Sequence, residues 1–196
     1  TVSLRLGTYD PQKKCYLMWY FDSHGTAAGP SQGKWDAKTS TTTWRDKTAD
    51  GGAAVATSRF VDDNTVTWSY IVKDASGEVT IHIEGQSKRV KQLPKRKDAP
   101  TIKPVKLSAE QKVLDRFVGT WLSKHKELKS EWTPVERTVE SSLTYRRVLG
   151  GKFVQEQGKG SDKRTSLAMY SYDTRRKSYH LRWFSSAGQI AEATGK

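Results

Sequence analysis

The sequence predicts an all-β protein built from antiparallel strands, with one short helix. The dominant hydrophobic period is two, and turn-forming residues recur at intervals typical of antiparallel sheets. Seven Trp, eight Tyr and five Phe stand in a chain that is only 35% hydrophobic, which predicts an aromatic-rich core. The length of 196 residues suits one barrel or sandwich.

The clearest strands form a meander. In residues 66–73 apolar and polar side chains alternate, with Ile71 as the exception, and turn residues flank the segment on both sides. A second alternating strand, residues 79–84, follows after a short turn. The other expected strands are residues 15–22, 41–45, 53–61, 121–128, 137–149, 152–158, 165–172 and 179–184.

One helix is expected directly before Gly119. Ser108 is a candidate N-cap, and Glu110 and Gln111 lie near the N3 position of a capping box. Apolar residues then recur at helical spacing until Gly119 ends the helix. The helix therefore leads into the segment FVGTW, in which a Gly-x-Trp triplet begins a strand.

The first 31 residues recur near the other end of the chain. Residues 1–31 align with residues 164–194, with ten identities in the 31 positions. The offset of 163 residues is the length of a whole domain, whereas solenoid repeats run at roughly 20–50 residues. We therefore predict tandem copies of one domain, with residues 1–90 as the C-terminal part of one copy and residues 108–196 as the N-terminal part of the next.

The net charge of +13 is concentrated in one segment. Residues 88–106 contain eight Lys or Arg, one Asp and three Pro. Such a composition buries too little apolar surface to offset the entropy of ordering, so residues 91–107 are expected to be an extended tether. Faces that bind nucleic acid interleave basic and aromatic side chains. The segment has no aromatic residue, so nucleic acid is not an expected partner.

Eight short motifs together resemble a known family. Residues 108–196 contain FVGTW, SEWTPVERTVE, RRVLGGKFVQEQ and LAMYSYD, and residues 1–90 contain YLMWYFDSHG, GKWD, SRFVDDNTVTW and VKDASGE. In this combination they are similar to the bacterial domain of unknown function 1579. In that family the first group of motifs precedes the second, so the order in this chain is permuted.

The resemblance implies an up-and-down, lipocalin-like (calycin-like) barrel of about ten strands, in a bacterial protein whose family is often exported. In lipocalin-like barrels the Trp of the Gly-x-Trp triplet closes one end and stacks under a basic residue that follows the last strand; here these are Trp121 and Arg89, with Lys88 as the alternative basic residue. The two parts of the chain are expected to close into one permuted barrel. One of the equivalent hairpins, Tyr9–Gly25 or Tyr172–Gly188, is then surplus and is expected to pair with a neighbouring copy or to lie outside.

The expected function is a non-catalytic module that binds a small apolar or amphipathic ligand inside the barrel, without cofactor or metal. The resemblance implies no catalytic residue, and the chain lacks the common catalytic and phosphate-binding motifs. A filled aromatic core is the alternative for the same side chains. The candidate ligand-binding residues are Trp19, Trp44, Arg59, Trp68, Tyr70, His82, Tyr145, Gln155 and Trp183.

Two other functions stay open. An enzyme would need an acid–base group, and His125, Glu140 and Glu156 could supply one if they converge inside the barrel. The basic tether could instead bind an anionic polymer or a partner protein, although adjacent basic residues on a strand point to opposite faces. The chain has no apolar run long enough to span a bilayer, and its single cysteine, Cys15, excludes an internal disulfide.

Overall fold

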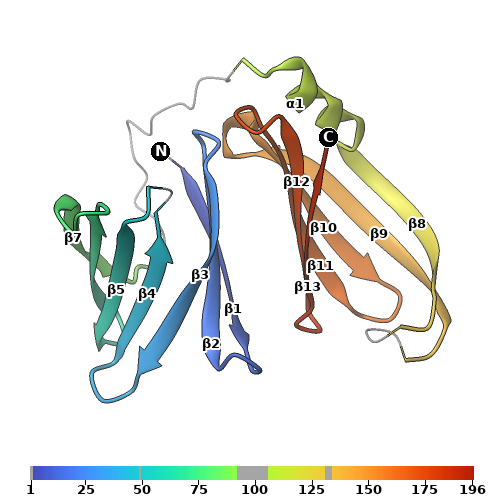
Figure 1. The fold of residues 1–196 in the computed structure, drawn as a ribbon. Helices are drawn as coiled ribbons and strands as arrows, with labels where there is room; N and C mark the ends of the chain where they lie inside the picture. Colours follow the sequence, from blue (N-terminus) through green and yellow to red (C-terminus); the bar gives the residue numbers. More distant parts are fainter. Residues whose placement is uncertain (1, 49, 92–105, 131–133) are drawn as a thin grey trace. The chain divides into compact units, whose positions relative to one another are not determined.

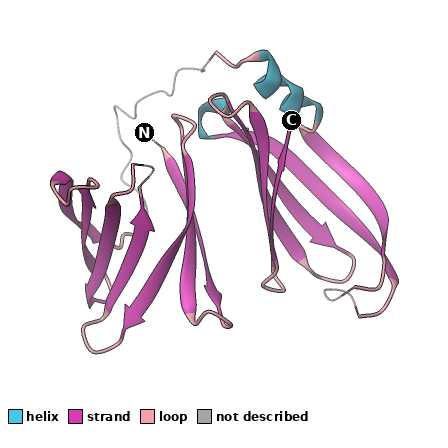
Figure 2. Ribbon diagram, in the orientation of Figure 1, coloured by secondary structure: helices cyan, strands magenta, loops and turns pink. Residues whose placement is uncertain are grey.

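The computed structural model describes residues 2–48, 50–91, 106–130 and 134–196. In these residues the chain forms two antiparallel sheets and one short α-helix (Figure 1). Two compact units result, one of residues 1–4, 21–26 and 101–196 and the other of residues 5–20 and 27–100. The predicted all-β class with one short helix is confirmed, and strands dominate the ribbon in Figure 2. Most of the expected tether, residues 92–105, lies outside the described residues.

The first sheet has seven strands in chain order. They are β1 (Ser3–Asp10), β2 (Cys15–Asp22), β3 (Ala27–Asp36), β4 (Thr41–Lys47), β5 (Ala53–Asp62), β6 (Thr65–Lys73) and β7 (Val79–Lys88). Short turns connect all of them, as the meander pattern predicts.

One face of the first sheet is aromatic. Trp44 pairs with Ala56, which pairs with Tyr70, and Trp68 lies two residues before Tyr70, so these rings share a face. Glycine residues make room for rings on this face; for example, a Cβ on Gly85 would lie 2.3 Å from the ring of Trp68. Much of this face is accessible, and Ile83 is 51% exposed. The other exposed members of this face are Trp35, Phe60, Tyr70 and Ile81.

The second sheet has six strands in the order β13-β12-β11-β10-β9-β8. They are β8 (Gly119–Glu127), β9 (Arg137–Val148), β10 (Phe153–Gly160), β11 (Thr165–Asp173), β12 (Ser178–Ser185) and β13 (Ile190–Gly195). On one face of this sheet Phe153 packs edge-on against Phe21, with ring centroids 5.5 Å apart. The guanidinium of Arg182 lies 5.7 Å from the centre of the Phe21 ring. This face therefore holds a buried aromatic core of its unit.

The helix α1 (Ala109–Val113) begins with the predicted capping box. The Ser108 hydroxyl accepts from the Gln111 backbone N–H at 3.2 Å, and the Gln111 side chain accepts from the Ser108 N–H at 3.0 Å. A 3₁₀ turn, Leu114–Arg116, follows directly. Arg147 on β9 fixes this segment to the sheet, because its guanidinium donates to Asp115 Oδ1 at 2.7 Å and also to the carbonyl oxygens of Gln111 and Gly151.

The two repeated segments fold into the same hairpin. β1 and β2 correspond to β11 and β12 at the offset of 163 residues. In the first hairpin Asp10 Oδ1 accepts from two turn N–H groups at 3.0 Å, and Asp173 Oδ1 does the same in the second at 2.8 and 3.1 Å. The paired tyrosines also match, with ring centroids 5.1 Å apart for Tyr9–Tyr16 and 4.8 Å for Tyr172–Tyr179.

The described strands form two open sheets and not the single closed barrel of about ten strands that we expected. Each sheet contains its own version of the hairpin: β1–β2 extends the first sheet and β11–β12 lies within the second. Whether one of the hairpins is surplus stays a prediction. β13 occupies the second-sheet position that β3 occupies in the first, but β3 continues into β4 whereas β13 is an edge strand.

Candidate functional site

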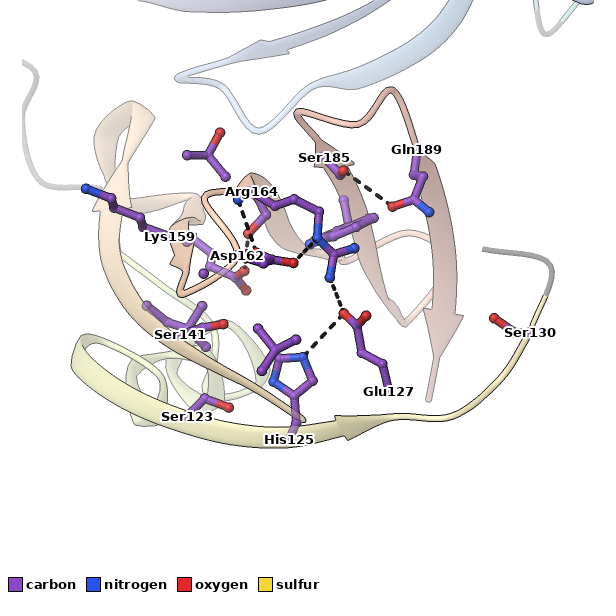
Figure 3. A pocket seen from close by; sticks show the side chains of 18 of the residues that line it. Ser123, His125, Glu127, Ser130, Ser141, Lys159, Asp162, Arg164, Ser185 and Gln189 are labelled. Atoms are coloured by element: carbon purple, nitrogen blue, oxygen red, sulfur yellow. Dashed lines mark hydrogen bonds and ion pairs between the residues drawn. The ribbon is translucent and has the colours of Figure 1, made fainter. Parts of the chain in front are cut away.

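A pocket of about 430 Å³ lies against one face of the second sheet (Figure 3). Directly paired residues of neighbouring antiparallel strands point to the same face. Ser123 on β8 pairs with Ser141 on β9, and both line the pocket. Glu156 on β10 pairs with Ala168 on β11, which pairs with Trp183 on β12. The pocket face is therefore opposite to the face that carries Phe153.

The wall of the pocket is mixed in character. Val139, Leu143 and Trp183 provide apolar surface. Hydroxyl groups provide much of the rest, from Ser123, Ser130, Ser141, Thr165, Ser166 and Ser185. Gly158 opens the space on β10, since a Cβ there would lie 3.0 Å from Leu143 and 2.3 Å from the Ser166 hydroxyl. A pocket with an apolar body and a few converging polar groups is typical of small-molecule sites.

A network of four charged side chains borders the pocket. Glu127 on β8 accepts hydrogen bonds from Arg137 Nε, at 2.8 Å, and from Arg164. Asp162 also accepts from Arg164, and its Oδ2 lies 3.4 Å from Arg137 Nη2. Burial alone would raise the pKa of Glu127, but hydrogen bonds from Arg137 and Arg164 lower it overall. The same balance lowers the pKa of Asp162. Two carboxylates and two guanidinium groups thus compensate each other.

His125 projects from β8 beside this network (Figure 3). Its Nε2 lies 3.7 Å from Glu127 Oε1. The imidazole side chain is 46% exposed, so it is partly open to solvent.

Glu156 is the most buried acid of the pocket, with 5% of its surface exposed. Its Oε2 accepts from the Tyr170 hydroxyl at 2.7 Å, and its Oε1 accepts from Ser166 at 3.5 Å, the outer limit of a hydrogen bond. No Lys, Arg or His of the described residues forms an ion pair with it. Among the described residues, the pocket therefore contains one carboxyl group that has hydroxyl partners but no cationic partner.

Three aromatic rings surround the Glu156 end of the pocket face. Phe117 stacks on Tyr145 and on Tyr170, with centroids 5.9 and 5.7 Å apart. Burial, followed by the negative charge of Glu156, raises the pKa of Tyr145 to about 12. The same causes raise the pKa of Tyr170, in which burial is the larger effect and the hydrogen bond to Glu156 follows. Both phenols consequently stay protonated and act as donors.

The structure separates the predicted ligand-binding residues. Tyr145 and Trp183 lie on the pocket face of the second sheet, and Trp183 lines the pocket. Gln155 is on the opposite face, where its side-chain oxygen accepts from Arg146 at 2.9 Å. The sequence predicts Glu156 and His125 as acid–base candidates, and Glu156 is not among the predicted ligand-binding residues. Those two line the pocket, whereas Glu140 faces away and pairs with Lys124 at 3.1 Å.

The other predicted residues belong to the first sheet. Trp44, Trp68 and Tyr70 share its aromatic face, whereas Arg59 pairs with Thr41 and Thr67 on the opposite face. His82 is also on that opposite face and bonds Glu84 at 2.9 Å. Trp19 on β2 is almost fully buried, with 1% exposed.

The two residues expected to close a barrel make local contacts. Trp121 donates its indole N–H to the Phe117 carbonyl at 2.6 Å and remains 49% exposed. The backbone N–H of Arg89 donates to the Asn64 carbonyl at 2.7 Å. Barrel closure by this pair stays a prediction.

Among the described residues, no group of His, Cys, Asp and Glu is placed to hold a metal ion. No helix in this part of the chain is long and apolar enough to cross a membrane.

Residues 106–195 match the family described as a protein of unknown function (DUF1579). The matched segment contains α1 and all six strands of the second sheet, so the pocket lies within the part of the chain that is similar to this family. The predicted resemblance is confirmed for this part of the chain, and for residues 1–90 it stays a prediction. No curated protein and no solved structure matches the chain.

Proposed function

We propose that the second sheet binds a small amphipathic molecule in the pocket between Ser123, Ser141, Glu156 and Trp183. The observation that carries this proposal is a space of about 430 Å³ that side chains leave open over a sheet with a well-packed opposite face. Ligand pockets for small molecules range from about 300 to 1,000 Å³. An apolar wall beside many hydroxyl groups suits a ligand with an apolar body and a few polar atoms.

The pocket is a binding site in this proposal and not a catalytic one. The rim carboxylates Glu127 and Asp162 are held by Arg137 and Arg164, so they are not free to take a proton from a ligand. The tyrosines beside Glu156 have raised pKa values, which makes them stable donors and poor bases at neutral pH.

The test is a two-dimensional NMR titration with 2-phenylethanol, a small neutral amphipathic molecule. We expect saturable shifts of the backbone amides around Ser123, Ser141 and Leu143. Ser141→Phe should fill the pocket and weaken binding at least about tenfold, which corresponds to about 1.4 kcal/mol. Thr144→Phe is the matched control, because Thr144 lies on the same strand and is exposed on the other face. Absence of pocket shifts in the wild-type chain, or equal binding by both variants, would refute the proposal.

A second candidate function is association between copies of this domain. β3 pairs with β4 in the first sheet, and its repeat equivalent β13 has a free edge among the described residues. Edge strands with unpaired backbone groups are templates for another strand. We propose that β13 takes the place of β3 beside β4 of a second copy, because β4 is paired on both sides, with β3 and β5, in this structure. Within one chain, the same exchange would produce the permuted lipocalin-like barrel predicted from the sequence.

A further inference from the structure

We propose that the pocket recognises a ligand with a cationic nitrogen, and that Glu156 is the residue that binds it. This inference rests on the proposed function, because it names the ligand class of the same pocket. It follows from the charge balance, the free acceptor capacity of Glu156 and the aromatic wall.

Among the described residues, the charge balance leaves Glu156 as the one acid at the pocket without an ion-pair partner. Glu127 and Asp162 are matched by Arg137 and Arg164 at the rim. Lys159 borders the pocket, but alternate residues of a strand share a face, so Lys159 lies on the same face of β10 as Gln155 and Gln157. Its side chain therefore belongs to the face opposite to the pocket. His125 is engaged with Glu127. Within the described part of the chain, an anionic ligand would therefore meet the buried acid Glu156 and no free cation on the pocket face.

The carboxylate of Glu156 keeps acceptor capacity after its local hydrogen bonds are counted. A carboxylate offers about four acceptor positions on its two oxygens. Tyr170 donates to Oε2 at 2.7 Å, the Tyr145 hydroxyl also bonds the carboxylate, and Ser166 approaches Oε1 at 3.5 Å, all of them neutral donors. A buried charge without a partner is costly, and a cation supplied by a ligand would remove that cost.

The surrounding aromatic side chains favour the same ligand class. Trp183 lines the pocket one strand beyond Ala168, the cross-strand neighbour of Glu156. Indole faces attract cations in addition to offering apolar contact. An ammonium group on an apolar body would satisfy both the carboxylate and the ring.

The experiment compares three probes of similar shape on the wild-type chain: 2-phenylethylamine, 2-phenylethanol and 3-phenylpropionate, each titrated by NMR at neutral pH. We expect the amine to bind at least about tenfold more tightly than the alcohol, and the carboxylate to bind most weakly. Glu156→Gln keeps the side-chain shape and should reduce this preference to about twofold or less. Glu140→Gln is the matched control on the opposite face and should leave the preference unchanged.

The outcomes distinguish the two proposals. If the alcohol binds in the pocket and the amine binds no more tightly, the proposed function stands and the cation inference fails. If Glu156→Gln retains the full preference for the amine, Glu156 is not its partner and the inference also fails. If no probe shifts the pocket amides, both proposals fail. The wild-type comparison needs no variant, so misfolding of Glu156→Gln would not leave the inference untested.

Discussion

At the scale of single residues, the interaction between Glu156 and Tyr145 makes the free energy of unfolding depend on pH in the alkaline range. Burial and the charge of Glu156 raise the pKa of Tyr145 from 10.0 to about 12 in the folded chain. A group whose pKa is higher in the folded than in the unfolded state stabilises the folded protein. This contribution is complete at pH values below the unfolded-state pKa, and it is lost as the pH rises through the folded-state pKa. The contribution of Tyr145 is therefore complete below about pH 10 and disappears towards pH 12.

We predict that the free energy of unfolding falls less steeply between pH 10 and 12 in Glu156→Gln than in the wild type. The substitution removes the charge that disfavours tyrosinate, while the burial remains. The measurement is urea unfolding at several pH values, with Glu140→Gln as the control for removal of an acid elsewhere. Parallel pH profiles for wild type and Glu156→Gln would show that Glu156 does not act on Tyr145.

The sequence does not predict to which face of the sheet the residues of β10 point, and this limits what it predicts about the site. A shift of one residue moves a side chain to the other face. Gln155 was predicted to bind ligand and Glu156 was not, yet Glu156 lies in the pocket and Gln155 bonds Arg146 on the other face. The segment 153–156 is buried throughout, so no alternation of polar and apolar residues indicates which face is which.

At the scale of elements, the two equivalent hairpins carry the same local strain. Lys14 and Lys177 close the turns with φ angles of 49° and 50°, in the left-handed region. A turn followed by one left-handed residue is a common hairpin connection in which glycine is usual. Side chains with a Cβ cost about 1–2 kcal/mol in this conformation.

We predict that Lys14→Gly and Lys177→Gly each stabilise the protein by about 0.5–1 kcal/mol, after the entropy cost of glycine is subtracted. Lys13→Gly is the control, because Lys13 has no positive φ angle and should only lose stability. Urea unfolding midpoints measure the effect. Similar responses of Lys13→Gly and Lys14→Gly would contradict the role assigned to the turn conformation.

The sequence predicted the elements well where alternation was clear and poorly where it was not. Residues 15–22 were expected as a strand and are β2, and the capped helix begins at its predicted residue. β3 was missed, because it contains Gly29, Pro30 and Gly33 and little apolar alternation. β1 was missed although its repeat equivalent, residues 165–172, was predicted, so the alignment itself contained the missing signal.

At the scale of the whole molecule, the repeat gives β4 two equivalent partners in one sequence. Gln32 on β3 pairs with Arg45 on β4. The offset of 163 residues, continued one residue beyond the aligned segment 1–31, places Gly195 of β13 at the position of Gln32, whereas a one-residue gap would align it with Gly33. Because the two hairpins share turn geometry and aromatic pairing, the edge of β13 can present the same backbone pattern as the edge of β3.

This equivalence predicts that Arg45→Cys combined with Gly195→Cys forms a disulfide between chains under mild oxidation. The background should be Cys15→Ser, since Cys15 is the single cysteine of the chain. Paired residues of antiparallel strands have Cα atoms about 4.5–5.5 Å apart, which is within disulfide reach. Arg45→Cys with Gln32→Cys is the positive control, because the structure already pairs these positions.

Non-reducing electrophoresis and size-exclusion chromatography distinguish the possible results. Covalent dimers or longer chains would support association of copies through β13, and their yield should rise with protein concentration because the contact is intermolecular. A cross-link within one chain would instead support the permuted barrel. If only the control pair of Gln32 and Arg45 becomes oxidised, β4 stays with β3 in solution and both uses of the β13 edge are excluded.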